Sequence, residues 1–183
     1  MPTWHTGSLL VAMPALEDPA FARAVVLLID HDEDGALGVV INRASEVPVS
    51  EATETFIDLV PAPGVLFGGG PVEPDALVAI GQAQEGAART ESTFVEGLRL
   101  VDLDQDPLLA GAELTQVRLF AGYAGWGPGQ LEHELWHHAW VVVDSEPGDV
   151  FTSRPETLWR DVLARQRGSL QLLADFPADA RVN

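Results

Sequence analysis

The sequence predicts an α+β fold with a mixed β-sheet in a single domain. Its 183 residues fit one domain. Apolar runs that predict strands outnumber the segments that predict helices, and few connections are long enough for a regular series of βαβ units. No internal repeat of about 20–50 residues is present. We therefore expect residues 1–183 to form one domain.

The clearest predicted strands form a hairpin. Residues 24–29 are a β-branched apolar run, which predicts a strand buried on both faces. An acidic turn at residues 32–35 ends in glycine, and residues 36–41 return as the partner strand. Similar apolar runs between turn residues predict the other strands, at residues 7–12, 65–67, 76–81, 93–95, 98–101, 115–121 and 140–144.

Helices are predicted where a capping residue precedes a run with one apolar face. Ser50 is the expected N-cap of one helix. Ser153 and Glu156 have the spacing of a capping box and are expected to open another. The predicted helices cover residues 18–22, 50–60, 130–138, 153–167 and 169–176.

Charge and composition exclude several classes of function. The chain has 28 acidic residues against 10 arginines and no lysine, which gives a net charge of -18. The absence of lysine excludes Schiff-base chemistry and a Walker-type phosphate loop. Direct nucleic-acid binding is not expected, because such binding depends on neutralising phosphates. The chain also has no cysteine, so disulfides and thiolate ligands are excluded.

The sequence gives no sign of a membrane or secretory segment. Its longest apolar runs are far shorter than the roughly 20 residues that a membrane span requires. The N-terminal residues have neither a basic region nor an apolar segment typical of a signal peptide. We therefore expect a cytoplasmic protein without membrane contact.

Residues 133–137 match the His-Glu-x-x-His pattern of zinc enzymes. Two histidines at this spacing lie on one face of a helix, and the glutamate could activate a zinc-bound water. The predicted helix is short, however, and no residue marks a third ligand. Residues 30–35 resemble the opening of a calcium-binding loop, but Ile41 stands where a bidentate glutamate is needed. We expect neither a metal site nor a cofactor.

Motifs spread along nearly the whole chain resemble those of the YqgE/AlgH family of bacterial proteins. These motifs lie at residues 7–14, 18–21, 31–38, 42–43, 69–72 and 122–132. The resemblance implies a strongly bent mixed sheet that forms a pseudo-barrel flanked by helices. It implies no established biochemical activity, although one family member is named as a regulator of alginate production. His133 and His137 fall where the family pattern has no histidine.

Three functions are compatible with the sequence. The first is a non-enzymatic regulatory or binding protein that takes an unknown small ligand or a protein partner. The second is a hydrolase or isomerase that uses His31 with Glu132 or Glu134 as acid and base. The third is a transcriptional regulator that binds DNA. The chain is not expected to be an enzyme, because it shows no nucleophile or metal signature, and no catalytic residue is assigned.

The polar and glycine-rich motifs each follow a predicted strand, and we expect them to meet on one surface. Such strand ends are common ligand sites in open sheets, and glycines would let a ligand approach the backbone closely. The alternative is that Arg43 and Glu132 pair with each other and only brace a loop. The predicted surface consists of Asn42, Arg43, Gly69, Gly70, Pro71, Trp126, Gln130 and Glu132.

Overall fold

The computed structural model describes residues 3–106, 108 and 112–177. Within them, ten strands form one sheet with the order β10-β1-β2-β3-β9-β6-β8-β7, and β5 joins β4 to β9. The pairs are antiparallel except β5–β9, which is parallel. The strands are β1 (Leu9–Ala12), β2 (Val25–Asp32), β3 (Gly35–Val40), β4 (Ala44–Pro48), β5 (Val65–Gly68), β6 (Val72–Ala83), β7 (Thr93–Val95), β8 (Leu98–Leu100), β9 (Leu114–Trp126) and β10 (Trp140–Val143).

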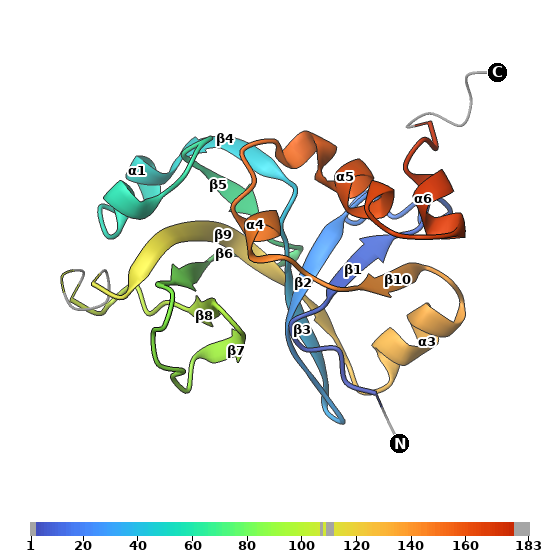
Figure 1. The fold of residues 1–183 in the computed structure, drawn as a ribbon, viewed down its shortest axis with the longest axis horizontal. Coiled ribbons are helices and arrows are strands. Elements are labelled where there is room, and N and C mark those ends of the chain that lie inside the picture. Colours follow the sequence, from blue (N-terminus) through green and yellow to red (C-terminus); the bar gives the residue numbers. More distant parts are fainter. Residues whose placement is uncertain (1–2, 107, 109–111, 178–183) are drawn as a thin grey trace.

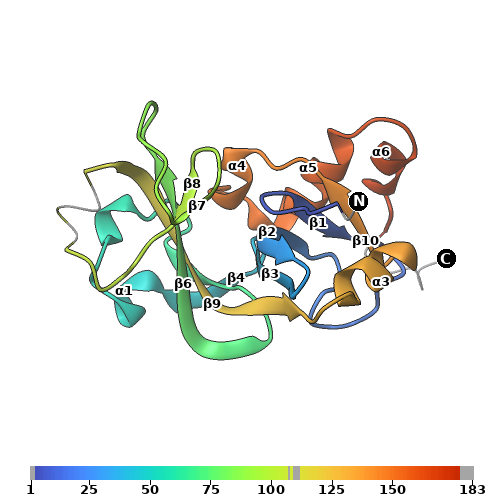
Figure 2. The same ribbon diagram turned by 90° about the horizontal axis from the view of Figure 1, so that it is seen from below.

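The sheet is strongly bent, so its two ends approach each other without closing. Val95 on the edge strand β7 packs against Gly7, just before β1. A Cβ atom added to Gly7 would lie 2.8 Å from the Val95 side chain. Figure 2 shows the curvature along β6 and β9. The predicted α+β fold with a bent mixed sheet and flanking helices is confirmed.

Each face of the β1–β2–β3 region packs against a different set of helices, as Figure 1 shows. Leu9 and Val11 belong to the core that includes Trp159 of helix α5. Leu10 belongs to a second core, which includes Leu131 of helix α3. Because successive side chains of a strand point to opposite faces, this arrangement explains the unbroken apolar runs of the sequence. The helices are α1 (Val49–Ala52), α3 (Gln130–Trp136), α4 (Pro147–Val150), α5 (Leu158–Ala164) and α6 (Ser169–Leu173), with 3₁₀ turns η1 (Ile57–Leu59) and η2 (Pro155–Thr157).

The helix predicted at residues 50–60 is wrong in its length and its cap. Helix α1 ends at Ala52, and Thr53 has extended backbone with φ -159°. The Thr53 hydroxyl accepts a hydrogen bond from the backbone N–H of Thr55, 3.0 Å away. This local bond competes with a continued helix, as threonine side chains often do. Phe56 then takes a left-handed backbone conformation, and its ring lies in a third apolar core together with Leu66 and Val117.

The predicted capping box at Ser153 and Glu156 is also wrong. The chain forms η2 there without a side-chain cap, and α5 begins at Leu158. A capping box does occur one element earlier, where the Glu146 backbone N–H donates to Asp149 at 2.8 Å. The helix predicted at residues 18–22 is a turn closed by hydrogen bonds to the Asp18 carbonyl. Strand β4 was not predicted, because its residues are mostly exposed and lack an apolar run.

None of the helices within the described residues has both the length and the apolar character needed to cross a membrane.

Candidate functional site around helix α3

The glycine-rich stretch that precedes α3 is the second half of β9. The strand predicted to end at residue 121 continues to Trp126 and pairs with β3. Gly69 and Gly70 cross directly beside it. A Cβ atom on Gly69 would lie 2.2 Å from the Gly122 carbonyl oxygen, and one on Gly70 would lie 2.2 Å from the Tyr123 carbonyl. These glycines therefore allow close contact between two segments of the same chain.

Glu134 joins α3 to the end of β9 and the start of β10. Its Oε2 accepts hydrogen bonds from the indole N–H groups of Trp126 (2.9 Å) and Trp140 (2.8 Å). Its Oε1 accepts one from the Gln130 amide (3.0 Å), and Gln130 in turn accepts one from the Gly127 backbone N–H. We call these four side chains, Trp126, Gln130, Glu134 and Trp140, the Glu134 network. The network fixes α3 on the sheet.

The residues of the His-Glu-x-x-His pattern lie on different sides of α3. Glu134 points toward two buried indoles, whereas His133 and His137 lie on the exposed side of α3 with ring centroids 4.2 Å apart. Nδ1 of His137 lies 2.8 Å from the His133 carbonyl oxygen. The carboxylate is therefore not placed to activate a water held by the two rings. The expectation that the chain binds no metal stays a prediction.

A second polar contact joins α3 to the β2–β3 hairpin. Buried His31 lies with Nε2 2.9 Å from Oε1 of Glu132, while its Nδ1 accepts the His5 backbone N–H at 3.1 Å. This pattern fits the tautomer whose Nε2–H donates to the carboxylate. The Trp4 ring meets His31 edge-on, with centroids 5.1 Å apart. Both ring nitrogens of His31 are thus engaged inside the protein.

Glu132 is the ionised and accessible member of this contact. Its own backbone N–H lowers the pKa of the carboxyl most, burial partly opposes this effect, and the hydrogen bond and charge of His31 lower the pKa further. The side chain is 48% exposed. Asp30, next to His31 in the sequence, accepts the His31 backbone N–H instead of its ring, so these neighbours do not form an acid–base pair.

Asn42 and Arg43 hold the turn that precedes β2. The Asn42 side chain bonds both to the Val25 N–H (2.9 Å) and to the Arg23 carbonyl (2.9 Å). The Arg43 guanidinium donates to the carbonyls of Pro19 (3.2 Å) and Ala22 (3.1 Å). Burial lowers the pKa of Arg43. Since Glu132 binds His31, the alternative in which Arg43 and Glu132 pair with each other is wrong.

The predicted surface residues thus fall into three groups with internal contacts. Asn42 and Arg43 brace a turn, and Gly69 and Gly70 line the crossing with β9, where exposed Pro71 follows them. Of the other three, Gln130 and Glu132 belong to α3, and Trp126 at the end of β9 is bonded to Glu134 of the same helix. Whether the three groups share one ligand remains a prediction, and only Glu132 combines charge with substantial exposure.

The exposed side of α3 carries two aromatic residues that the sequence analysis did not single out. Trp136, one helical turn after Glu132, is 81% exposed, and Trp4 is 42% exposed. Figure 1 shows α3, the N-terminal segment and the tip of the β2–β3 hairpin at the same end of the molecule. A tryptophan within an amphipathic helix pattern is usually a core residue, so the sequence alone did not mark Trp136 as exposed.

Further carboxylates lie at the tip of the β2–β3 hairpin, at the same end of the molecule as α3 (Figure 1). Asp30, Asp32 and Asp34 line a shallow hollow of about 250 Å³ at the hairpin tip, next to Trp126. In the described part of the chain, no arginine forms an ion pair with these aspartates or with Glu132. We call Trp4, Glu132 and Trp136 the α3 face. Asp30 and Asp32 alternate with His31 along β2, so their side chains lie on the opposite side of the hairpin from Glu132.

Comparisons with known proteins agree with the fold. The AlgH-like family model (DUF179) matches residues 9–171. A UPF0301 protein of Streptomyces coelicolor is 52% identical over 97% of this chain and 95% of its own length. A UPF0301 protein of Thermobifida fusca is 45% identical over the same shares.

Two solved structures are similar to the whole chain. A crystal structure of a Corynebacterium diphtheriae protein has a TM-score of 0.90 and 33% identity, covering 96% of this chain and 94% of that one. The solution structure of the AlgH protein from Pseudomonas aeruginosa has a TM-score of 0.69 and 34% identity, covering 98% of both chains. The matching family model and these relatives show that the chain belongs to the AlgH-like family.

Proposed function

We propose that this protein is a non-enzymatic binding protein whose α3 face takes a basic segment of a protein partner. The observation that carries the proposal is the 81% exposure of Trp136 beside the ionised carboxylate of Glu132. A large aromatic side chain left in water on a fixed helix is typical of the residues that dominate binding energy at protein interfaces.

The α3 face is held rigid before any partner arrives. The Glu134 network fixes α3 from the sheet side, and the His31–Glu132 contact fixes it from the hairpin side. A surface ordered in advance loses little conformational entropy on binding. This rigidity supports recognition by a preformed face.

Charge favours a basic partner. Glu132 and the three aspartates at the nearby hairpin tip lack an arginine partner in the described residues, and the whole chain has a net charge of -18. Such a field increases the rate of encounter with a cationic surface. Arginine or lysine side chains of the partner would pair with Glu132 and lie over the Trp136 ring, an arrangement worth about 0.5–2 kcal/mol.

The two alternatives have less support. An acid–base enzyme would need His31 or Glu134 to reach a substrate, but both nitrogens of His31 and both oxygens of Glu134 have internal partners. A DNA-binding regulator would have to overcome repulsion between the phosphates and the acidic surface. A regulatory role through contact with another protein, in the cytoplasm, is the form of regulation that we propose.

A titration with defined peptides tests the proposal. Fluorescein-labelled hexa-arginine is added to the protein, with hexaglutamate as the opposite-charge probe, and binding is followed by anisotropy. Trp136→Ser is expected to weaken hexa-arginine binding about fivefold, in line with the loss of one cation–π contact. The matched control is Leu172→Ser, because Leu172 is a 78% exposed apolar residue on another helix, α6. Equal binding by the two variants would exclude Trp136 as the anchor.

A further inference from the structure

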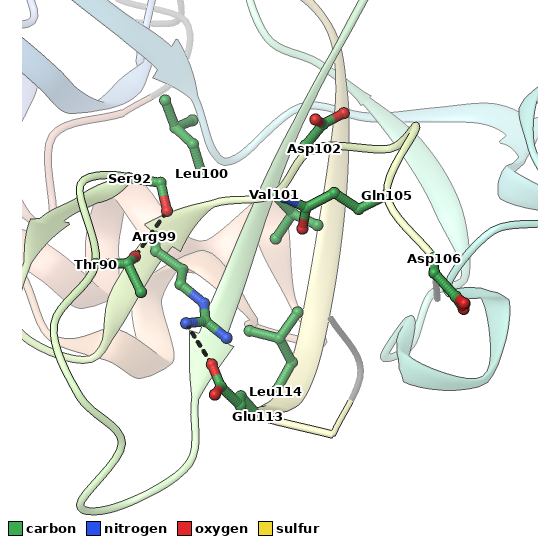
Figure 3. A pocket seen from close by; sticks show the side chains of 10 residues that line it. All are labelled: Thr90, Ser92, Arg99, Leu100, Val101, Asp102, Gln105, Asp106, Glu113 and Leu114. Atoms are coloured by element: carbon green, nitrogen blue, oxygen red, sulfur yellow. Dashed lines mark hydrogen bonds and ion pairs between the residues drawn. The ribbon is translucent and has the colours of Figure 1, made fainter. Parts of the chain in front are cut away.

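A second hollow, separate from the α3 face, lies beside the first residues of β9. It has a volume of about 650 Å³ and lies between the turn that precedes β7, strand β8 and the segment that leads into β9 (Figure 3). This volume is within the range of pockets that hold small molecules. We propose that the hollow binds a short peptide with a free C-terminal carboxylate and a basic residue at its other end.

Arg99 is the group that would bind the carboxylate. Its side chain is 9% exposed and lies on β8 between Thr93 of β7 and Gly81 of β6. One guanidinium nitrogen, Nη1, is 3.0 Å from Oε2 of Glu113. That contact is the one ion pair of Arg99 among the described residues, and it leaves N–H groups of the planar guanidinium available for a second carboxylate.

Hydroxyl groups add donors next to Arg99. Thr90 and Ser92 line the same hollow, and their hydroxyl oxygens lie 2.9 Å apart. Figure 3 shows the Arg99 guanidinium between these hydroxyls and Glu113. A guanidinium flanked by hydroxyls is a chemical environment that suits a carboxylate better than a neutral group.

The opposite side of the hollow has the opposite charge. Asp102 and Asp106 lie there with Gln105, away from Arg99 (Figure 3). The described residues give neither aspartate an arginine partner. An ammonium or guanidinium group of a ligand would be attracted to this side while its carboxylate binds Arg99. The separation of the two charges favours a peptide over a simple anion.

An apolar floor connects the two charged sides. Val101 and Leu114 form it, and Gly81 makes room for both, since a Cβ atom there would lie 2.7 Å from Val101 and 2.8 Å from Leu114. Such a floor would take the small side chains of a peptide between its charged ends.

Glu113 is the internal competitor of the ligand. Its side chain is 60% exposed, so it can leave Arg99 when another carboxylate arrives. Removal of its charge should therefore strengthen binding, which is the opposite of what a structural ion pair alone would produce.

Calorimetric titration with the tripeptide Lys-Ala-Ala tests the site. The free acid is expected to bind, and the C-terminal amide is expected to bind about tenfold more weakly, the size of one lost charge-assisted contact. Glu113→Gln should strengthen binding of the free acid several-fold. Asp102→Asn should weaken it, while leaving the binding of N-acetyl-norleucine-Ala-Ala, which has no cationic group, unaffected. The control is Arg89→Gln, because Arg89 lies outside this hollow.

Two results would overturn the proposal. One is equal affinity of the free acid and the amide for the unmodified protein. The other is weaker or unchanged binding of the free acid by Glu113→Gln. Both measurements use the native chain or a surface variant, so neither depends on whether a substitution of the buried Arg99 folds.

Discussion

The two ends of strand β9 hold their polar groups in different ways. At the Trp126 end, every polar atom of the Glu134 side chain has an internal partner, and the helix that follows is fixed. At the Leu114 end, buried Arg99 has a single carboxylate partner among the described residues, exposed Glu113, and faces a hollow. One strand thus joins a rigid face, suited to a large partner, to an open pocket, suited to a small ligand.

In the middle of β9, buried Arg118 forms no ion pair with a carboxylate in the part of the chain that the structure describes. Arg118 is 1% exposed and donates from Nη2 to the carbonyls of Ala62 (3.0 Å) and Thr152 (3.3 Å). Its guanidinium lies 4.2 Å from the centroid of the Phe67 ring, and burial lowers its pKa to about 10. Arg118 ties two loops together inside the protein, whereas Arg99 is accessible from a hollow. The two arginines differ in that Arg99 lines a hollow whereas Arg118 does not, and for this reason we propose a ligand only for Arg99.

The largest expected effect concerns the glycine crossing at the Trp126 end. Gly70→Ala should lower the free energy of unfolding by about 3 kcal/mol or more. The added Cβ would lie 2.2 Å from the Tyr123 carbonyl, and φ is +153°. The control is Gly129→Ala, which has positive φ but no atom within 4 Å of the added Cβ, and should cost only about 1 kcal/mol. Guanidinium denaturation measures both, and equal losses would contradict the crowding argument.

The next effect tests the Glu134 network. Glu134→Leu should destabilise the protein by about 2–3 kcal/mol, because two indole N–H groups lose their acceptor in a mostly buried setting. Glu134→Gln keeps one acceptor oxygen and should lose roughly half as much. Urea denaturation followed by tryptophan fluorescence distinguishes the two. If both variants unfold at the same urea concentration as the native protein, the network does not fix α3.

Hydrophobic patterning predicted most of the sheet, and side-chain contacts explain where it failed. The runs at residues 24–29 and 36–41 are strands as expected, since both faces are buried. The end of β9 was missed because its glycines resemble a loop, whereas they serve a close crossing with Gly69 and Gly70. The helix at residues 50–60 was overextended because its apolar spacing gave no sign of the local bond at Thr53.

The candidate site could be located by sequence only in part. Glu132 was named, and its neighbourhood on α3 is the region that we propose for binding. His31 was named with Glu132 or Glu134 only as an acid–base alternative. The two residues that make the contact are 101 positions apart, and no local pattern shows which of the two glutamates His31 meets. Trp136 and Arg99 were missed for a related reason. Exposure of a tryptophan, and the lining of a hollow by an arginine, depend on packing between distant segments.

The smallest expected effect is a pH dependence confined to the α3 end. Burial, and then the charge of His31, lower the pKa of His5, against an opposing effect of Glu132. The pKa of Glu132 is lowered as well. Both groups therefore bind protons more readily in the unfolded chain. Their stabilising contribution is complete above their ordinary values of 6.5 and 4.5 and is lost as the pH falls through the lower folded values.

Two substitutions separate these contributions. Compared with the native protein, His5→Gln should remove the loss of stability just below pH 6.5, and Glu132→Gln the loss below pH 4.5. Each difference should stay below about 1 kcal/mol, because both groups are largely solvent-screened. Thermal unfolding at a series of pH values measures them. The Arg99 end supplies the comparison: Glu113→Gln should leave the His5 step unchanged, since Glu113 is not among the groups that shift either pKa. A change in that step would show that the two ends of β9 are electrostatically coupled and do not act independently.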